Sequence, residues 1–384
     1  MSYDAVINVL LQSLKALNII KDCIDGDWNN CINWVNARIS EVWEDRGAYP
    51  GIGTMLCSAG FPFGILIAEE IKKGLKAGED IWNKLDVAIE CPQKNLSQEI
   101  AKSISPINQR AWKCLNSERK NLFKLLSRFS LTLDQAYVIY NVEQREEFGL
   151  ACTDKEIIEN PYILYEQTRD KEPFLQIAVS KVDMAVFPPI KIQEKYPLPK
   201  PSCLSSDNDE RRIRAIAISI LESQTQNGHT IYPCNKLIID MNELAIAPKC
   251  NVNKDVMESI AEFLEKEIVI VKMKNEDNAY QLFRLQEIDK LIRNSIIKRI
   301  NSKKRHVVDE DWRVIIDKDF GETKEELEIK ARQEKAAILK ELAESRLSAL
   351  IGGAGTGKTT LLALLCSSKK IEDGSILILA PTGK

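Results

Sequence analysis

Histidine is scarce in this sequence, and this limits the metal chemistry that the chain can support. Among 384 residues only His229 and His306 are histidines, and the ten cysteines include no C-x-x-C pair. A structural zinc site needs four such ligands at short, regular spacings, so no zinc site is expected. The N-terminus also lacks the charged segment and small-residue cleavage site of a secretory signal, so we expect reduced cysteines.

Long apolar runs and a strong net charge are missing as well. No stretch approaches the roughly 18 consecutive apolar residues that a membrane-spanning helix needs. The net charge is −3, with 44% hydrophobic and 28% charged residues. We therefore expect a soluble, cytoplasmic protein of two to four domains without a membrane partner. Any surface that binds nucleic acid should be a local patch.

A glycine-rich segment near residue 355 matches the pattern of a phosphate-binding loop. Residues 352–359 read G-G-A-G-T-G-K-T, which fits G-x-x-x-x-G-K-[ST]. An apolar run at 347–351 precedes it and a leucine-rich helical pattern at 361–365 follows, so we expect a strand, a loop and a helix. Glycines let backbone N–H groups approach phosphate oxygens, and the helix N-terminus adds positive potential. A glycine-rich turn before a core helix is the structural alternative.

This pattern assigns a role to each residue type and predicts ATP with Mg²⁺ as cofactors. Lys358 is expected to reach the β- and γ-phosphates, and the Thr359 hydroxyl to bind Mg²⁺. These two residues form the predicted catalytic pair, with Thr359 as the metal ligand. The predicted nucleotide-binding residues of the loop are Gly352, Gly353, Ala354, Gly355, Thr356, Gly357, Lys358, Thr359 and Thr360.

The segment ILILAP at 376–381 is typical of a buried parallel strand. In P-loop folds the strands are parallel and crossover helices connect them, and strands covered on both faces are continuously apolar. We therefore expect this segment to be the strand after the first helix, in an α/β lobe that continues beyond residue 384.

Two motifs together resemble those of a known enzyme family. The pair GGAGTGKTT at 352–360 and LAPTGK at 379–384 resembles motifs I and Ia of superfamily 1 DNA helicases of the RecD-like branch. The resemblance implies that the second motif contacts the single strand that is moved. It also implies that Gln333 reads the adenine, although a lone exposed glutamine ordinarily has no such role. The DNA contacts implied in this way are Ala380, Pro381, Thr382 and Gly383.

The same resemblance predicts parts that residues 1–384 do not contain. The family's acidic Walker B pair, its glutamine-bearing motif and its arginine fingers would follow residue 384. Phosphoryl transfer needs a metal held from two sides, a positioned water and a cation on the developing charge. Residues 1–384 alone are therefore not expected to hydrolyse ATP.

Residues 206–306 are predicted to form a winged-helix-like module with a basic tail. The spacing of Ile213, Ile216, Ala217, Ile220 and Leu221 predicts a helix that ends near Gly228. A second helix is expected at 255–267, with Val256, Ile260, Phe263 and Leu264 on its apolar face, followed by two strands around a polar turn at 275–278. The helix followed by Gly-His-Thr at 228–230 resembles the segment before the motor in RecD-like helicases; His229 is expected in a turn or the core. This module could contact DNA or act as a spacer.

Residues 121–205 are predicted to form a helix-hairpin-helix-like region with a proline-rich linker. Glu159 to Tyr162 read E-N-P-Y, which marks a helix entrance in RecD-like proteins. Further upstream, Pro50-Gly51-Ile52-Gly53 could present backbone N–H groups to a DNA phosphate or form an ordinary turn.

The remaining segments complete a multi-domain prediction. Residues 1–120 are expected to form a helical domain of unknown role, with Trp28, Trp34, Trp43 and Trp82 in its core. Linkers are expected at 187–210 and 315–330, and the start of the RecA-like P-loop lobe at 325–384. The basic segment 290–306 is either a solvated helix face or a surface that tracks phosphates. The expected fold is thus a mainly α-helical N-terminal region followed by the beginning of an α/β domain.

The leading functional prediction is the N-terminal part of an ATP-dependent DNA helicase or translocase. The resemblance implies 5′-to-3′ movement on single-stranded or forked DNA, with a nuclease or a defence system as potential partners. Two alternatives stay open: an accessory protein that binds nucleotide and DNA without turnover, and a P-loop signalling NTPase. ATPase activity stimulated by single-stranded DNA would distinguish a helicase from the signalling class.

Overall fold

The chain folds into two compact units, Met1–Arg284 and Leu285–Lys384, which are described separately. A computed structural model describes residues 2–76, 79–274, 278–302, 308–353, 355–372 and 376–379. Within these ranges no helix has the length and apolar content needed to cross a bilayer. The finer division into four domains stays a prediction.

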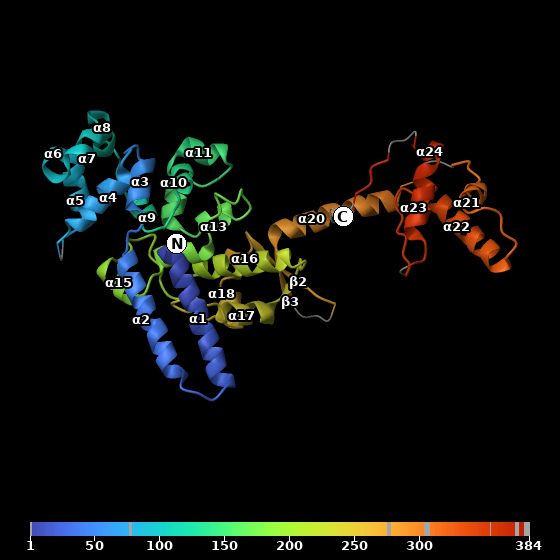
Figure 1. Cartoon of the computed structure of the whole chain (residues 1–384), viewed down its shortest axis with the longest axis horizontal. Helices are drawn as coiled ribbons and strands as arrows, with labels where there is room; N and C mark the ends of the chain where they lie inside the picture. The colour runs from blue at the N-terminus through green and yellow to red at the C-terminus, as the bar shows by residue number, and fades with distance from the viewer. Residues whose placement is uncertain are drawn as a thin grey trace. The chain divides into compact units, whose positions relative to one another are not determined.

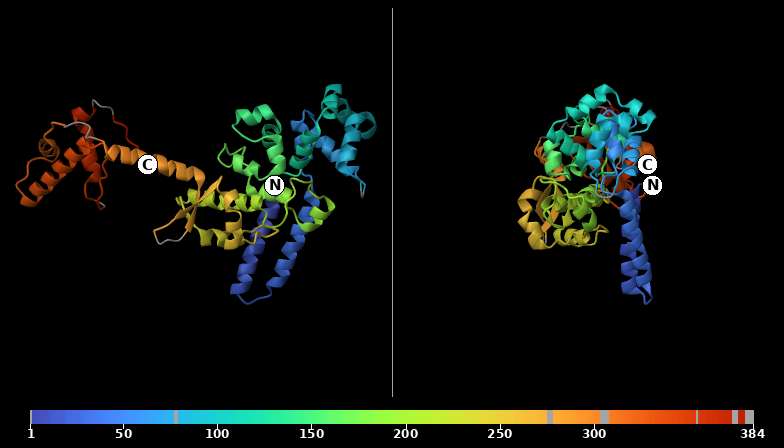
Figure 2. Two further views of the ribbon diagram at one scale, coloured as in Figure 1. Left: turned by 180° about the vertical axis from the view of Figure 1, so that it is seen from behind. Right: turned by 90° about the vertical axis from the view of Figure 1, so that its left-hand side faces the viewer.

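The first unit begins with two long helices that pack side by side. They are α1 (Tyr3–Cys23) and α2 (Trp28–Arg46), shown in blue in Figure 1, and both views of Figure 2 show the pair projecting from the rest of this unit. Trp43 joins α1 in a buried apolar cluster, and the buried side chains of Asp4 and Arg46 form an ion pair. The core placement of Trp43 and Trp82 is confirmed, whereas Trp34 is 60% exposed. Trp34 lies on the face of α2 opposite the packed one, so its prediction as a core residue was wrong.

A region of short helices follows α2, and many of them begin at a side-chain cap. Ser105, Thr132 and Thr153 each start a helix with a reciprocal capping box. Short helices of this kind depend on such caps and on tertiary packing. The helices are α3 (Ile52–Ser58), α4 (Gly64–Lys73), α5 (Ile81–Glu90), α6 (Pro92–Asn95), α7 (Gln98–Ser103), α8 (Pro106–Lys113), α9 (Ser117–Leu126), α10 (Leu133–Tyr140), α11 (Val142–Glu147), α12 (Asp154–Glu159), α13 (Ile163–Thr168), α14 (Val179–Val186) and α15 (Ile190–Lys195).

The Pro50–Gly53 segment is a packing feature, in which Gly51, Ile52 and Gly53 are buried and Pro50 is half-buried. The Gly51 N–H donates to the carbonyl of Ser127 over 2.9 Å, and Gly51 is buried. A Cβ added to Gly51 would lie 2.2 Å from the carbonyl oxygen of Phe129. The glycine therefore allows close contact with the segment after α9. Of the two alternatives for this tetrapeptide, the structure supports the ordinary turn over an open phosphate-binding hairpin.

Helix α16 (Glu210–Gln226) has nine buried residues. Its predicted apolar face is confirmed, because Ile213, Ile216, Ala217, Ile220 and Leu221 are all buried. The helix ends before Gly228, whose φ is +89°, and the exposed His229 lies in the turn, as predicted.

Two arginines of α16 are buried as well. Arg212 pairs with Asp183 of α14, and Arg214 pairs with Glu166 of α13. Each guanidinium makes two hydrogen bonds to its carboxylate, all between 2.7 and 2.9 Å. These pairs attach α16 to the helices before it.

A three-stranded antiparallel sheet follows α16, in the order β1-β3-β2. Strand β1 (Tyr232–Pro233) pairs with β3 (Asn278–Leu282), and β3 pairs with β2 (Ile268–Lys272) in the register Ile270 opposite Tyr280. The predicted hairpin is confirmed. Between β1 and β2 lie α17 (Cys234–Asn242), α18 (Lys254–Ser259) and α19 (Ala261–Leu264). The predicted second helix is divided between α18 and α19, and among its expected core residues only Leu264 is fully buried.

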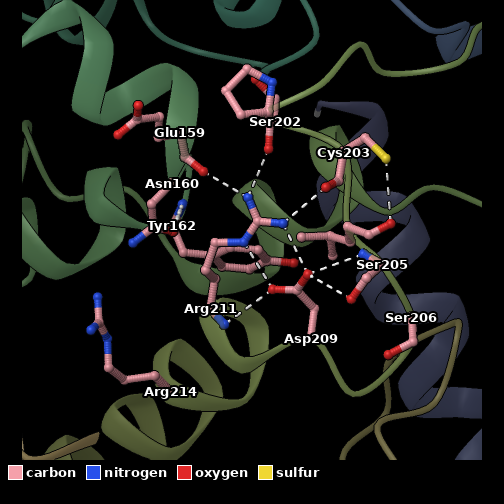
Figure 3. A network of polar contacts seen from close by, with 12 residues as sticks. Glu159, Asn160, Tyr162, Ser202, Cys203, Ser205, Ser206, Asp209, Arg211 and Arg214 are labelled. Atoms are coloured by element: carbon pink, nitrogen blue, oxygen red, sulfur yellow. Dashed lines mark hydrogen bonds and ion pairs between the residues drawn. The ribbon is translucent and has the colours of Figure 1, made fainter. Parts of the chain in front are cut away.

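The proline-rich segment before α16 is hydrogen-bonded to the rest of the unit. Arg211 donates to the carbonyl oxygens of Glu159, Pro201 and Cys203, and it also pairs with Asp209 (Figure 3). Ser202 is only 2% exposed and donates to the carbonyl of Ile158. This part of the segment therefore packs as structure and is not a free linker.

The second unit is built around three helices. Helix α20 (Phe283–Ile300) contains the boundary between the units and has no buried side chain. Trp312 and Ile316 of α21 (Trp312–Phe320) form a buried cluster with α22 (Glu326–Glu344) and α23 (Lys358–Ser367), and α24 (Lys369–Glu372) follows. Because Ile316 is fully buried in this cluster, the interpretation of 315–330 as a linker was wrong for α21.

Candidate nucleotide-binding site

The glycine-rich loop adopts a backbone conformation that requires glycine at two positions. Gly355 has φ +76° and Gly357 has φ +80°, both in the left-handed region. Side chains with a Cβ are strained there, whereas glycine is not. Gly357 is the N-cap of α23, so the turn directs the chain into the helix at Lys358.

Two side chains at the loop donate hydrogen bonds to the loop's own backbone. The Lys358 ammonium donates to the carbonyl oxygens of Gly352 and Gly353, at 2.8 and 2.6 Å. The Thr356 hydroxyl donates to the same Gly353 carbonyl at 2.9 Å. A positive charge is therefore held against the loop, one residue after Gly357. The N-terminus of α23 adds backbone N–H groups that have no partner within the helix.

The loop is positioned by the core of the second unit. Leu361 and Leu364 of α23 are buried against Leu339 of α22 and against α21. A helix whose first turn is fixed in this way holds the preceding loop in a defined place, and this arrangement suits repeated binding of a phosphate group.

The threonine hydroxyl groups predicted to contact the nucleotide or Mg²⁺ are accessible to solvent. Thr356, Thr359 and Thr360 are all exposed. The donor set fits a nucleotide with Mg²⁺: an ammonium, helix N–H groups and a threonine hydroxyl, of which the last is an oxygen ligand suited to a hard cation. Across the described ranges no group of three or more His, Cys, Asp or Glu side chains could hold a metal by itself.

Gln333 lies on the exposed face of α22. Its neighbour Arg332 is 5% exposed and makes ion pairs of 2.8 Å with Glu328 and with Asp317 of α21. The sequence analysis did not identify Arg332 as a buried residue. An arginine that lies next to apolar helix positions and near acidic residues could have indicated a buried ion pair. The assignment of Gln333 to the adenine stays a prediction. Ala337, one turn after Gln333 in α22, is exposed as well.

The predicted strands on either side of the loop do not form in the described residues. Residues 347–351 and 376–379 have no strand pairing, and Ile351 is 90% exposed. Leu377, Ile378 and Leu379 are exposed to a similar degree, between 78 and 82%. A parallel strand makes all its ladder hydrogen bonds with neighbours, and the described part of this unit contains no strand that could pair with these segments. The predicted site residues Ala354, Ala380, Pro381, Thr382 and Gly383 lie outside the described residues.

Comparison with known proteins supports the nucleotide site. Residues 329–384 match a family described as AAA domain, a P-loop NTPase family that also occurs in RecD-like helicases. The matched range begins in α22 and includes Gln333 and the whole loop. No curated protein and no solved structure matched the chain. The match supports nucleotide binding at the C-terminal part of the chain.

Proposed function

We propose that this chain carries the accessory region and the nucleotide-binding start of an ATP-dependent DNA helicase or translocase of the RecD-like type. The observation that carries the proposal is the loop at 352–358, where two left-handed glycines and the Lys358 ammonium precede the N-terminus of α23. In this role Lys358 binds the β- and γ-phosphates and Thr359 holds Mg²⁺. Bound Mg²⁺ would neutralise charge that develops on the phosphates during transfer.

The segment from α16 to α20, which spans the end of the first unit and the start of the second, supports a DNA-binding role. The order α16, β1, α17, α18–α19, β2, β3 with sheet order β1-β3-β2 is the arrangement expected of a winged helix. Helix α20, which follows directly, exposes Lys290, Arg293, Lys298 and Arg299. We assign to this part of the chain contact with the DNA ahead of the motor, with movement in the 5′-to-3′ direction.

The test measures ATP turnover by a protein that carries these residues together with the rest of its motor, with and without single-stranded DNA. Turnover should rise at least tenfold with DNA, and Lys358→Ala should abolish it. Lys340→Ala is the matched control, because Lys340 is an exposed lysine on α22. Duplexes with a 5′ tail should be unwound, and those with a 3′ tail should not.

Each alternative gives a different result. If the protein binds ATP but does not hydrolyse it, an accessory role replaces the proposal. If its rate of ATP turnover does not change when single-stranded DNA is added, a signalling NTPase replaces it. Unwinding only from 3′ tails would overturn the proposed direction.

A further inference from the structure

A cavity of about 260 Å³ lies in the first unit, whereas the P-loop belongs to the second. Its lining comes from the segment after α2, the start of α5, helix α9 and its C-terminal end, α12 and the proline-rich segment 197–202. Three cationic side chains line it: Lys124, Arg128 and Lys200. None of the described residues that line the cavity carries a carboxylate.

Arg128 is the most unusual of the three cations, because it is only 3% exposed. Its Nε donates to the carbonyl of Ala185 at 3.1 Å and its Nη2 to the carbonyl of Tyr196 at 2.7 Å. No carboxylate within the described ranges forms an ion pair with it, whereas the buried Arg46, Arg212 and Arg214 each have one. Burial lowers the pKa of the Arg128 guanidinium. A buried charge without a counter-charge is costly, and an anionic ligand in the cavity would relieve that cost.

Two aromatic rings orient the cations. The Arg128 guanidinium lies 5.3 Å from the Tyr49 ring, and the Lys124 ammonium lies 5.5 Å from the Trp82 ring. The two rings contact each other edge to face, with centroids 4.9 Å apart. These contacts hold positive charge toward the cavity without neutralising it.

The wall that carries Lys200 is also fixed. Ser202 is anchored to the carbonyl of Ile158, and Arg211 holds the carbonyls of Pro201 and Cys203 (Figure 3). Lys124 and Lys200 themselves are exposed. The cavity therefore combines one buried cation on a rigid support with two accessible lysines from different segments.

We propose that this cavity binds a backbone phosphate of a nucleic acid strand, with Arg128 as the buried contact and Lys124 and Lys200 as the accessible ones. Arginine and lysine are the side chains that contact phosphate most often, and phosphate contacts position a strand without reading its sequence. The choice of a nucleic acid rests on the proposed function, in which the accessory region contacts DNA.

The test uses the whole chain and a fluorescently labelled single-stranded oligonucleotide, with affinity measured by anisotropy over a series of salt concentrations. The variant Lys124→Glu/Lys200→Glu should bind about tenfold more weakly near 0.1 M salt. Each lost phosphate contact should reduce the slope of log affinity against log salt by about 0.7. The matched control is Lys102→Glu, an exposed lysine on α7 outside the cavity, which should leave the slope unchanged. Because both altered lysines are exposed, the melting temperature of the variant should be unchanged.

A second arm identifies the source of the phosphate. Pyrophosphate is titrated calorimetrically into Lys358→Ala, in which the P-loop no longer binds, with and without the two cavity substitutions. The proposal is supported if the cavity substitutions abolish pyrophosphate binding and also reduce the slope of log DNA affinity against log salt. If they abolish pyrophosphate binding but leave that slope unchanged, the cavity binds a free phosphate compound, and the nucleic-acid part of the proposal is overturned. If the cavity substitutions change neither pyrophosphate binding nor the salt dependence of DNA binding, the cavity is not a phosphate site. The proposed helicase function would be unaffected by that result. If the unaltered chain does not bind DNA at all, both the nucleic-acid assignment and the DNA-binding part of the proposed function fail.

Discussion

Arg212 and Asp183 form a buried, two-point ion pair between α16 and α14. The Arg212 Nε lies 2.7 Å from Asp183 Oδ1, and its Nη2 lies 2.9 Å from Oδ2. The Tyr162 hydroxyl donates to the same Oδ1 at 2.6 Å. Arg212 is fully buried and Asp183 is 5% exposed. The carboxylate therefore connects three helical segments of the first unit through one group.

Removing the charge of Asp183 should destabilise the first unit strongly. Asp183→Asn leaves the Arg212 charge buried without a counter-charge, and such changes cost about 3–5 kcal/mol. Urea unfolding followed by far-UV circular dichroism measures the free energy of unfolding. Glu258→Gln is the control, because the Lys254–Glu258 pair is exposed and should contribute less than about 0.5 kcal/mol. A loss below about 1 kcal/mol in Asp183→Asn would contradict the structural role of the pair.

Gly51→Ala should lower the melting temperature by several degrees. The added Cβ would lie 2.2 Å from the Phe129 carbonyl oxygen, and that backbone atom cannot move away cheaply. Overpacking of this kind costs about 1–3 kcal/mol. Gly74→Ala is the comparison, since its added Cβ would first meet the flexible Lys84 ammonium at 3.2 Å. Equal melting temperatures for the two variants would argue against close packing at Gly51.

Thr359→Ala should weaken nucleotide binding only when Mg²⁺ is present. Thr359 is exposed at the start of α23, so removal of its hydroxyl leaves the core unchanged. Affinity for a fluorescent ATP analogue should fall about tenfold or more with Mg²⁺ and stay unchanged with EDTA. An equal loss in both conditions would assign Thr359 to the loop conformation and not to the metal.

The buried cysteines predict a loss of stability at high pH. Burial raises the pKa of Cys152 and of Cys250 to about 11, from an ordinary value near 9. Between about pH 9 and 11 the unfolded chain releases these protons and the folded chain retains them. The free energy of unfolding therefore falls as the pH rises through this window, by about 2–3 kcal/mol for each thiol.

Urea unfolding at pH 8 and pH 10.5 measures this dependence, and the variant Cys152→Ala/Cys250→Ala is the comparison. Its stability should fall less between the two pH values. In the native protein at pH 8, iodoacetamide should label the exposed Cys23, Cys31, Cys91 and Cys114 and leave Cys152 and Cys250 unlabelled. Rapid native labelling of Cys152 or Cys250 would contradict their burial.

Local patterns predicted the parts of the fold that depend on local physics. The period of the apolar residues in α16 and the two strands around a polar turn in the β2–β3 hairpin follow from the geometry of one segment and its nearest neighbour. The glycines at 355 and 357 follow from a turn that only glycine adopts without strain. Each of these features can be read within about twenty residues.

Features that depend on distant partners were not predictable from such patterns. The apolar pattern of α16 did not indicate the burial of Arg212 and Arg214, because their partners Asp183 and Glu166 lie 29 and 48 residues away in the sequence. The cations that line the cavity around Arg128 likewise come from separate segments. The segments 347–351 and 376–379 failed as strands for a related reason: a parallel strand is defined by its neighbours and not by its own apolar content.

The hydrogen bonds of Arg211 have a consequence for the continuity of the chain. Its guanidinium holds the carbonyls of Glu159 and Pro201 on one side of Ser202 and that of Cys203 on the other. If the protein were produced as two polypeptides divided after Ser202, Arg211 in the second would still bind Glu159 and Pro201 of the first. The buried pairs of Arg212 and Arg214 would join the same two polypeptides. These contacts therefore connect the parts of the first unit before and after position 202 independently of the covalent chain between them.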